Sequence, residues 1–507
     1  MAGKRTAVVL VHGMGEQRPM ETLWSFVDAV WTHDPNVVAL DRREVWSHPS
    51  PVPGNYELRR VTTRGGLNGK RVDFYEFYWA HLMAGNTVAQ LRRWLVGLLV
   101  RRPSSVPARL KGVWVGGTAF LVMTALLLLG AAFAPQLVEW FGSERTSDPR
   151  RGGGLRLLLA GCAAVTFVAT MLLNGVLVPV AGDAARYFSP VPENVEARQK
   201  IREAGVDLLE RLTRSGFVDR IVLVAHSLGT TIAYDVLTHA WGKVSHDAWR
   251  KAHDDDAVAT ALAALQTASR ALYKKRHTAE EIATYRDCQR AYSAALSDAD
   301  APWLVSDFVS LGSPLSKGDV LMSRDADAFE LRKARREFPT CPPVSEGAVG
   351  EFTFDPDHGG RRIPHHAAPF APTVWTNIAF EHRLLFLGDV VAGPVRALFG
   401  SGIRDIVLPA GSRFRHLDYW KGSSADVAGA VPAALAALRR ALNLRGESER
   451  AVWGNAGGRI GAADLAAPGM PPQAPMQPDG ASGAAMGRAP DALASDPASP
   501  SPARVRP

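Results

Sequence analysis

The segment 219–240 predicts a strand, a tight turn and a helix in immediate succession, and this order constrains the fold of the chain most strongly. Asp219-Arg220-Ile221-Val222-Leu223-Val224 has the pattern of a buried strand, and the segment from Thr230 to Ala240 predicts a helix. Ser227 lies at the turn between them, in Ala225-His226-Ser227-Leu228-Gly229. A serine on a sharp strand-to-helix turn is the geometry that an exposed nucleophile requires. An ordinary turn with a capping serine is the alternative.

The rest of the chain repeats this alternation of strands and helices. Strands are predicted at 6–12, 56–63, 70–79, 303–311, 373–377 and 404–408. Helices are predicted at 20–31, 193–212 and 425–442. Such alternation is typical of the α/β class, and we expect a mainly parallel sheet with helices on both faces.

Two long apolar runs without charged residues separate the first strands from the Ser227 segment. Val113–Ala134 and Leu157–Ala181 are each long enough to cross a bilayer, which takes about 20 residues. The polar segment Pro135–Arg156 joins them, so we expect a transmembrane hairpin; two buried core helices are the alternative. Basic residues before the first run favour contact with anionic lipid headgroups and a cytoplasmic catalytic domain. They are Arg92, Arg93, Arg101, Arg102, Arg109 and Lys111.

These features divide the chain into four expected parts. Residues 1–90 and 186–445 form the two halves of one α/β unit, and residues 91–185 form the membrane segment. Within the second half, residues 241–300 are polar and Ala-rich with helical spacing, which indicates an inserted helical lid. Residues 446–507 are rich in Pro, Ala, Gly and Ser, and we expect them to be disordered.

Composition and spacing argue against several classes of function. The net charge of +8 is modest for 507 residues and no nucleic-acid module is recognisable, so we expect no nucleic-acid partner. The three cysteines are scattered and odd in number, which does not indicate a disulfide framework. Metal-ligand residue types gather in one Pro/Gly-rich segment, but their spacing matches no zinc or calcium loop, so we expect neither metal nor cofactor. These residues are Asp355, Asp357, His358, His365 and His366.

Three motifs resemble those of lipases and esterases in the α/β-hydrolase superfamily. Val11-His12-Gly13-Met14-Gly15 resembles their oxyanion loop, and Ala225-His226-Ser227-Leu228-Gly229 resembles their nucleophile elbow, with Ala225 where the family usually has glycine. Leu311-Gly312-Ser313-Pro314-Leu315 resembles the strand that follows the elbow helix. The motifs occur in the family's order over residues 6–445. The start of the chain, from His12 to Gln17, also looks like that of intracellular phospholipase-like hydrolases.

The resemblance implies a nucleophile and an oxyanion hole. Ser227 is the expected nucleophile, and the backbone N–H groups of Met14 and Leu228 are the expected oxyanion donors. His12 is expected to hold the loop, because the catalytic histidine of this fold follows the acid late in the chain.

The general base and the acid are sought downstream of Ser227. His416 is the best base, since it follows the last predicted strand and precedes the last predicted helix. The alternatives are His382 and the pair His365-His366. Asp389 resembles the family's acid, which comes after a strand ending in Trp375-Thr376-Asn377. The rival Asp405 opens a strand, and Asp418 is too close to His416 in sequence to reach its ring.

The resulting expectation is a membrane-anchored serine hydrolase that cleaves lipid or other acyl esters through an acyl-enzyme. An acyltransferase or peptidase on the same scaffold is one alternative. A catalytically idle hydrolase fold that serves as a membrane interaction module is another.

Overall fold

The computed structural model divides the chain into a unit of residues 1–469 and a second unit of residues 470–507. The residues that it describes all belong to the first unit. They are 5–14, 18–50, 52, 57–83, 88–132, 161, 178–244, 246–274, 276–356, 362–383, 387–421, 431–454 and 459–461.

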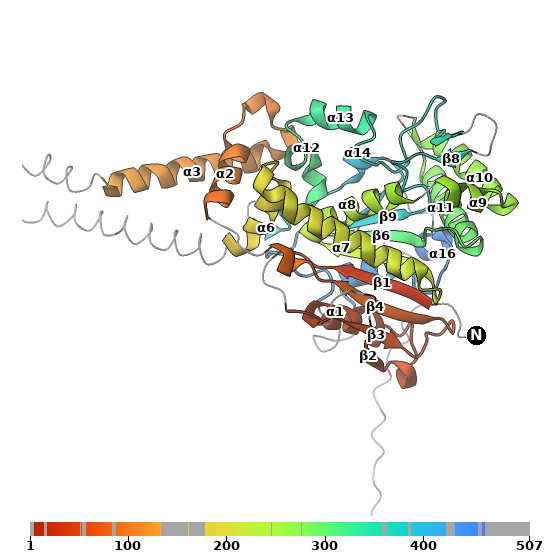
Figure 1. Cartoon of the computed structure of the whole chain (residues 1–507). Helices are drawn as coiled ribbons and strands as arrows, with labels where there is room; N and C mark the ends of the chain where they lie inside the picture. Colours follow the sequence, from red (N-terminus) through yellow and green to blue (C-terminus); the bar gives the residue numbers. More distant parts are fainter. Residues whose placement is uncertain are drawn as a thin grey trace, which may run out of the picture. The chain divides into compact units, whose positions relative to one another are not determined.

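The described residues form one large sheet in the strand order β13-β12-β9-β6-β5-β1-β4-β3-β2. Figure 1 shows this sheet with helices packed against it. Neighbouring strands from β13 to β4 are parallel, whereas β3 is antiparallel to both β4 and β2. The α/β class and the mainly parallel sheet are therefore confirmed. The strands are β1 (Arg5–Val11), β2 (Val45–Pro49), β3 (Arg59–Thr63), β4 (Arg71–Phe77), β5 (Val218–His226), β6 (Val305–Leu311), β9 (Val374–Phe380), β12 (Arg404–Leu408) and β13 (Arg459–Gly461).

Two short strand pairs and a series of helices accompany this sheet. The pairs are β7 (Thr353–Phe354) with β8 (Ile363–Pro364), and β10 (His382–Arg383) with β11 (Leu387–Gly388). The helices before the middle of the chain are α1 (Glu21–Val27), α2 (Val88–Leu99), α3 (Lys111–Ala132), α6 (Val178–Phe188), α7 (Val195–Arg214) and α8 (Leu228–Lys243). Those that follow are α9 (His246–His253), α10 (Asp256–Leu272), α11 (Ala279–Asp298), α12 (Gly318–Leu321), α13 (Ala326–Ala334), α14 (Arg396–Phe399), α15 (Ala433–Leu442) and α16 (Glu449–Trp453).

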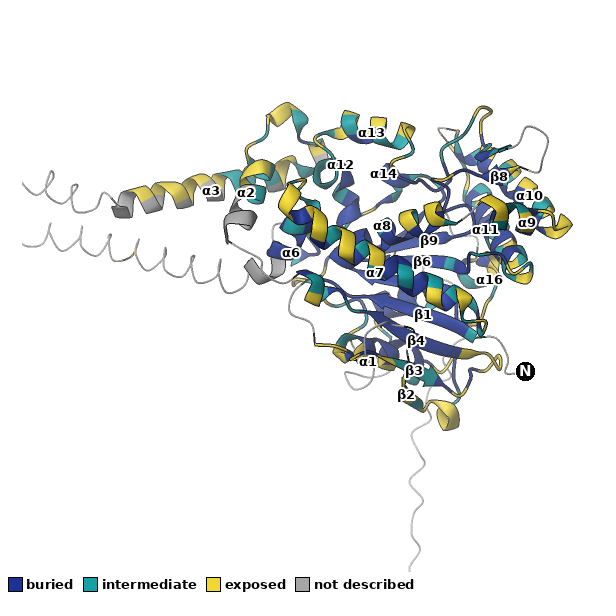
Figure 2. Ribbon diagram, in the orientation of Figure 1, coloured by how far each residue is buried: buried dark blue, intermediate teal, exposed yellow. Residues whose placement is uncertain are grey.

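The central strands of the sheet are buried on both faces, which Figure 2 shows as a dark blue centre, whereas the edge strand β2 is partly exposed. Alternate residues of β1 point to opposite sides, as the pleat requires. Val9 packs in one apolar cluster with residues of α7 and α8, and Val8 packs in another with residues of α1 and α15. A parallel strand between two layers of helices must be apolar on both sides, which explains why 7–11 is an uninterrupted hydrophobic run.

Most predicted elements are present, but the prediction for the C-terminal part of the chain is wrong in part. Residues 446–507 were expected to be disordered, yet α16 and β13 lie within them, and β13 pairs with β12. The buried carboxylate of Glu449 contacts the guanidinium groups of Arg286, Arg290 and Arg404. This ion cluster attaches α16 to the domain, and composition alone does not reveal it. Residues 462–507 lie outside the described residues.

The predicted insertion at 241–300 is helical, as expected, and its role as a lid stays a prediction. It forms α9, α10 and α11. Arg286 of α11 donates to the carbonyl oxygen of Trp375 at the start of β9, and Ser297 donates to that of Asp219 at the start of β5. These contacts place α11 along the amino ends of the strands. Ser227 follows the carboxyl end of β5, at the opposite edge of the sheet.

The predicted transmembrane hairpin has no support from the described residues. The first expected span, Val113–Ala134, coincides with α3 up to Ala132, and most of the second, Leu157–Ala181, lies outside the described residues. In the part of the chain that the structure describes, no helix combines the length and the apolarity that a membrane crossing needs.

Candidate active site

Ser227 is held in a strained conformation between β5 and α8. Its backbone has φ 54° and ψ −131°, a region that a residue with a side chain rarely adopts. Such a conformation costs about 1–3 kcal/mol and persists only when its surroundings enforce it. Here the N–H of Ser227 donates to the carbonyl oxygen of Leu311 at 2.9 Å, and its own carbonyl accepts from Thr230 N–H at 3.0 Å.

Two glycines let the chain pass close to this turn. A Cβ atom on Gly229 would lie 2.4 Å from the carbonyl oxygen of His12, so only glycine allows α8 to start against the end of β1. A Cβ atom on Gly13 would lie 3.0 Å from Cβ of Ser227. The predicted oxyanion loop and elbow motifs thus lie against each other, although Gly13 and Ser227 are 214 positions apart in sequence.

The structure brings Ser227, His416 and Asp389 together. Nε2 of His416 lies 2.8 Å from Oγ of Ser227, and Nδ1 of His416 lies 2.8 Å from Oδ2 of Asp389. A carboxylate can only accept, so Nδ1 carries the proton and Nε2 accepts from the serine hydroxyl. All three residues are buried. An arrangement of this kind can activate a serine hydroxyl, with the imidazole as base and the carboxylate as the group that orients it.

Asp389 is held as a carboxylate by several donors. Its Oδ1 accepts from the N–H groups of Val391 and Ala392, at 2.9 Å and 3.1 Å, and its Oδ2 accepts from the hydroxyl of Tyr419 at 2.7 Å as well as from His416. Burial by itself would raise the pKa of Asp389, but these hydrogen bonds and the nearby imidazole hold the pKa below its ordinary value. The acid therefore stays charged where it can stabilise an imidazolium.

Backbone pairing sets the distance between the acid and the base. Gly388 precedes Asp389, its N–H donates to the carbonyl oxygen of Arg413, and its carbonyl accepts from Arg415 N–H, both at 2.9 Å. Asp389 and His416 each follow one of these paired residues. Gly388 has φ +84°, and a Cβ atom there would overlap the carbonyl oxygen of Glu381, so this crossing requires glycine.

The third sequence motif, Leu311–Leu315, packs beneath the same site. Gly312 has φ +63°, and a Cβ atom on it would lie 2.9 Å from the ring of Tyr419, 3.2 Å from His416 Cε1 and 3.3 Å from Asp389 Oδ2. The next residue, Ser313, shares a 2.7 Å hydrogen bond with the hydroxyl of Thr230 on α8. The motif thus supports the acid and base from below and contacts the elbow helix.

His12 has the contacts of a loop-holding residue. Its Nδ1–H donates to the carbonyl oxygen of Gly13 at 2.8 Å, and its Nε2 accepts from Trp79 N–H at 3.3 Å. The indole of Trp79 donates back to the carbonyl of His12 at 3.0 Å and stacks on its ring. Burial lowers the pKa of His12 to about 4, so the ring is neutral near pH 7. Met14, one expected oxyanion donor, follows this segment, and Leu228, the other, opens α8.

The rival acids and bases lie elsewhere or are engaged otherwise. Asp405 accepts from Asn377 and from the N–H groups of Val395 and Arg396, and Asp418 pairs with Arg413. His382 is exposed on β10. His365 lies close to the carbonyl of Val344, and His366 is exposed.

Two residues beside the relay carried no prediction of a role. Tyr419 contacts Asp389, and His226 donates its Nε2–H to the carbonyl oxygen of His416 at 2.7 Å. In the sequence, His226 is simply the residue before Ser227, and Tyr419 is the third residue after His416. No spacing rule predicts that either residue contacts the triad.

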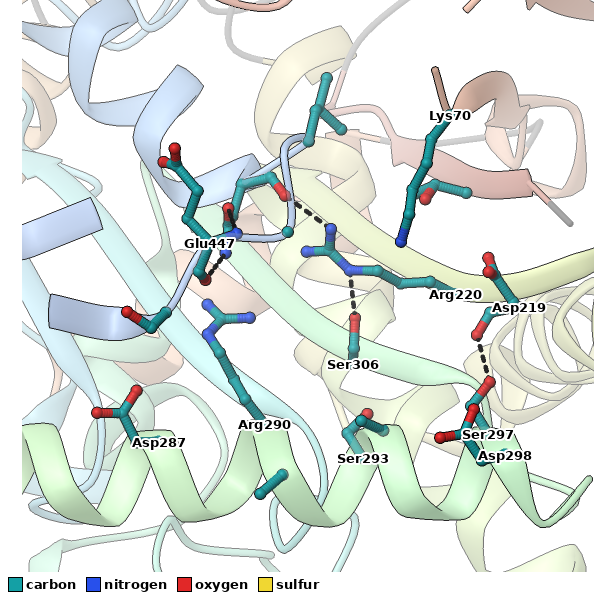
Figure 3. Close-up of a pocket in the computed structure, with 17 residues that line it drawn as sticks. Lys70, Asp219, Arg220, Asp287, Arg290, Ser293, Ser297, Asp298, Ser306 and Glu447 are labelled. Carbon is teal, nitrogen blue, oxygen red and sulfur yellow. Dashed lines mark hydrogen bonds between the residues drawn. The ribbon is translucent and has the colours of Figure 1, made fainter. Parts of the chain in front are cut away.

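A separate cavity of about 510 Å³ lies at the opposite edge of the sheet (Figure 3). Arg220, Arg290 and Ser297 are among its lining residues, and none of the three triad residues is. Its arginines are already paired: both contact the buried Asp307, and Arg290 also contacts Glu449. The described residues contain no group of three or more metal-ligand side chains, and the predicted loop residues Asp357 and His358 lie outside them.

Comparison with known proteins gives no relative from which a role could be transferred. No protein family, no curated protein and no solved structure matches this chain.

Proposed function

We propose that this protein is a serine hydrolase that cleaves carboxylic esters, with Ser227 as nucleophile, His416 as general base and Asp389 as the orienting acid. One observation carries the proposal. The Ser227–His416–Asp389 relay has two 2.8 Å contacts and begins at a serine held at positive φ. The strain at Ser227 and the buried charge of Asp389 are both costly, and a scaffold without chemistry has no need of either.

The first half of the reaction follows from the hydrogen-bond directions. Because the Ser227 hydroxyl donates to His416 Nε2, that nitrogen takes the proton as Oγ attacks the ester carbonyl carbon. The carbonyl oxygen becomes an oxyanion, which the N–H groups of Met14 and Leu228 are proposed to stabilise. When the tetrahedral intermediate collapses, His416 gives its proton to the leaving alcohol and Ser227 keeps the acyl group.

The second half reverses these roles. A water molecule attacks the acyl-enzyme and passes a proton to His416. The second tetrahedral intermediate then expels Ser227 Oγ, which regains that proton, and the carboxylic acid leaves. Asp389 stays ionised throughout and stabilises the imidazolium in both steps.

We further propose that the substrate is a lipid or another acyl ester that partitions into a bilayer, and that α3 contacts this bilayer. No charged residue occurs between Gly112 and Ala132. Five large apolar side chains of α3 are more than half exposed, and Figure 2 shows exposed positions along this helix. They are Val115, Val122, Met123, Leu126 and Leu129. The two-span hairpin and the cytoplasmic catalytic domain stay predictions.

A fluorophosphonate probe tests the hydrolase chemistry. We expect wild-type protein to be labelled at Ser227, and Ser227→Ala to lose both labelling and hydrolysis of a fluorogenic ester. Ser269→Ala removes another buried hydroxyl, which donates to the carbonyl oxygens of Gln266 and Gly350, and it should keep both labelling and hydrolysis. An unlabelled wild-type protein that is folded by circular dichroism would favour the idle scaffold.

Vesicle binding tests the lipid proposal separately. Leu126→Asp should reduce co-sedimentation with vesicles that contain anionic lipid, because an exposed leucine of α3 becomes charged. Leu331→Asp alters a similarly exposed leucine on α13 and should leave binding unchanged. Equal binding by the two variants would remove α3 from the proposal.

A further inference from the structure

Asp389 Oδ2 receives two hydrogen bonds, and only one of them comes from the base. His416 Nδ1 lies at 2.8 Å and the hydroxyl of Tyr419 at 2.7 Å. Both donors approach the same oxygen, while Oδ1 is occupied by the backbone N–H groups of Val391 and Ala392. The charge on Oδ2 is therefore shared between an imidazole and a phenol.

The phenol of Tyr419 is fixed in the donating orientation. Its oxygen accepts from the N–H of Phe380 at the end of β9, at 3.4 Å, which leaves its single proton for Asp389. Its ring packs on the ring of Phe380 with centroids 5.1 Å apart, and it is fully buried. Burial, together with the Asp389 charge, raises the pKa of Tyr419 well above its ordinary value, so the hydroxyl keeps its proton.

We propose that Tyr419 is a positioning residue of the triad: by sharing Asp389 Oδ2 with His416, it orients the carboxylate and limits how strongly that carboxylate stabilises protonated His416. The inference rests on the proposed function for its catalytic meaning. A second donor on a carboxylate oxygen disperses its charge, so less of that charge acts on the imidazolium.

His226, Lys317 and Asp418 are further ionisable groups near the relay, and each has partners of its own. From the elbow, the ring of His226 faces His416 with centroids 5.0 Å apart, and burial lowers the pKa of His226 to about 3, so it is neutral. Lys317 donates to the carbonyl oxygens of Val391 and Ala392. On the segment of the base itself, Asp418 pairs with Arg413 and Arg415. Tyr419 is the group among these that donates directly to the oxygen used by His416.

Removal of the hydroxyl tests the proposal. In Tyr419→Phe, the carboxylate acts more strongly on the imidazolium, so the pH at which His416 titrates should rise by about 0.5–1 pH unit. ¹⁵N-histidine NMR measures this titration without any need for activity. The acidic limb of the kcat/KM profile should move to higher pH by the same amount. A stronger donor, fluorotyrosine at position 419, should move both in the opposite direction.

The matched control is Tyr292→Phe. Tyr292 is also fully buried and its hydroxyl lies 2.8 Å from Nε2 of His253, but it belongs to α11 at the opposite edge of the sheet. This variant should lose a similar amount of stability and leave the His416 titration unchanged. An unchanged titration in both Tyr419 variants would overturn the proposal. Absence of probe labelling in the wild type would instead overturn the proposed function, because the NMR readout does not depend on catalysis.

Discussion

The Nε2–H of His226 donates a 2.7 Å hydrogen bond to the backbone carbonyl oxygen of His416, so the residue before the nucleophile holds the segment of the base. The ring of His226 also lies between two parts of the site, since a Cβ atom on Gly13 would be 3.0 Å from its Nδ1. One side chain thus links the loop after β1, the elbow and the histidine segment. A displacement of about 1 Å in such a relay can reduce the rate by two orders of magnitude.

We expect His226→Phe to slow fluorophosphonate labelling of Ser227 by about 10- to 100-fold, because the ring is retained but the donor to His416 is lost. A time course of labelling, quenched at set times and analysed by mass spectrometry, measures the rate. His226→Gln keeps an N–H donor and should recover part of it. His253→Phe, which alters another buried histidine away from the site, should label at the wild-type rate. Labelling of His226→Phe at that same rate would contradict this role.

Gly229→Ala should destabilise the protein by several kcal/mol and abolish labelling, because its Cβ would lie 2.4 Å and 2.6 Å from two backbone carbonyl oxygens of β1 and the following loop. Gly242→Ala is the matched control on the same helix, where a Cβ atom meets nothing within 4 Å. That change should be neutral or stabilise the protein by up to about 1 kcal/mol. Urea denaturation compares the two, and similar free energies of unfolding would refute the close approach.

Glu449→Gln should lower the free energy of unfolding by about 3–5 kcal/mol, since it removes the carboxylate that pairs with Arg286, Arg290 and Arg404. Burial alone would raise the pKa of Glu449, but the three arginines lower it far below its ordinary value. The contribution of Glu449 to the free energy of unfolding is therefore present above the unfolded-state pKa and is lost as the pH falls.

Glu447→Gln is the control near Glu449. It removes a partly exposed ion pair with Arg445 and should cost less than about 1 kcal/mol. Equal losses would mean that the cluster does not hold α16.

Glu76→Gln should stabilise the protein above pH 7 and not below pH 4.5. Burial raises the pKa of Glu76 to about 7, even though its carboxylate accepts from Met20 N–H. The folded protein thus binds a proton that the unfolded chain has released, and ionisation above pH 7 costs about 3 kcal/mol. The gain from the glutamine should grow between pH 4.5 and 7 and then level off. Thermal unfolding over this pH range measures it, with the exposed Glu44→Gln as control; a gain that does not vary with pH would contradict the shift.

The local chemistry of the elbow is contained in a short stretch of sequence. Neighbouring positions show an apolar strand, a small residue two positions before and two positions after Ser227, and an uninterrupted helix. The strand β5 and the helix α8 form where this pattern predicts them. The α/β class follows from the same kind of evidence, because hydrophobic periodicity reports which face of each element is buried. The order of motifs along the chain predicts Ser227, His416 and Asp389 as the site residues, and the structure brings these three together.

Only the tertiary structure decides what surrounds them. Tyr419 and His226 act on residues 30 and 190 positions away, and such contacts have no period that a sequence pattern can report. Glu449 is a charged residue in a Pro- and Gly-rich context, and it is buried solely because three arginines from α11 and β12 converge on it. The helices of 241–300 are evident in the sequence, but the place of α11 at the amino ends of the strands is not. Local propensity determines which elements form, whereas burial and pairing between distant segments determine where each side chain acts.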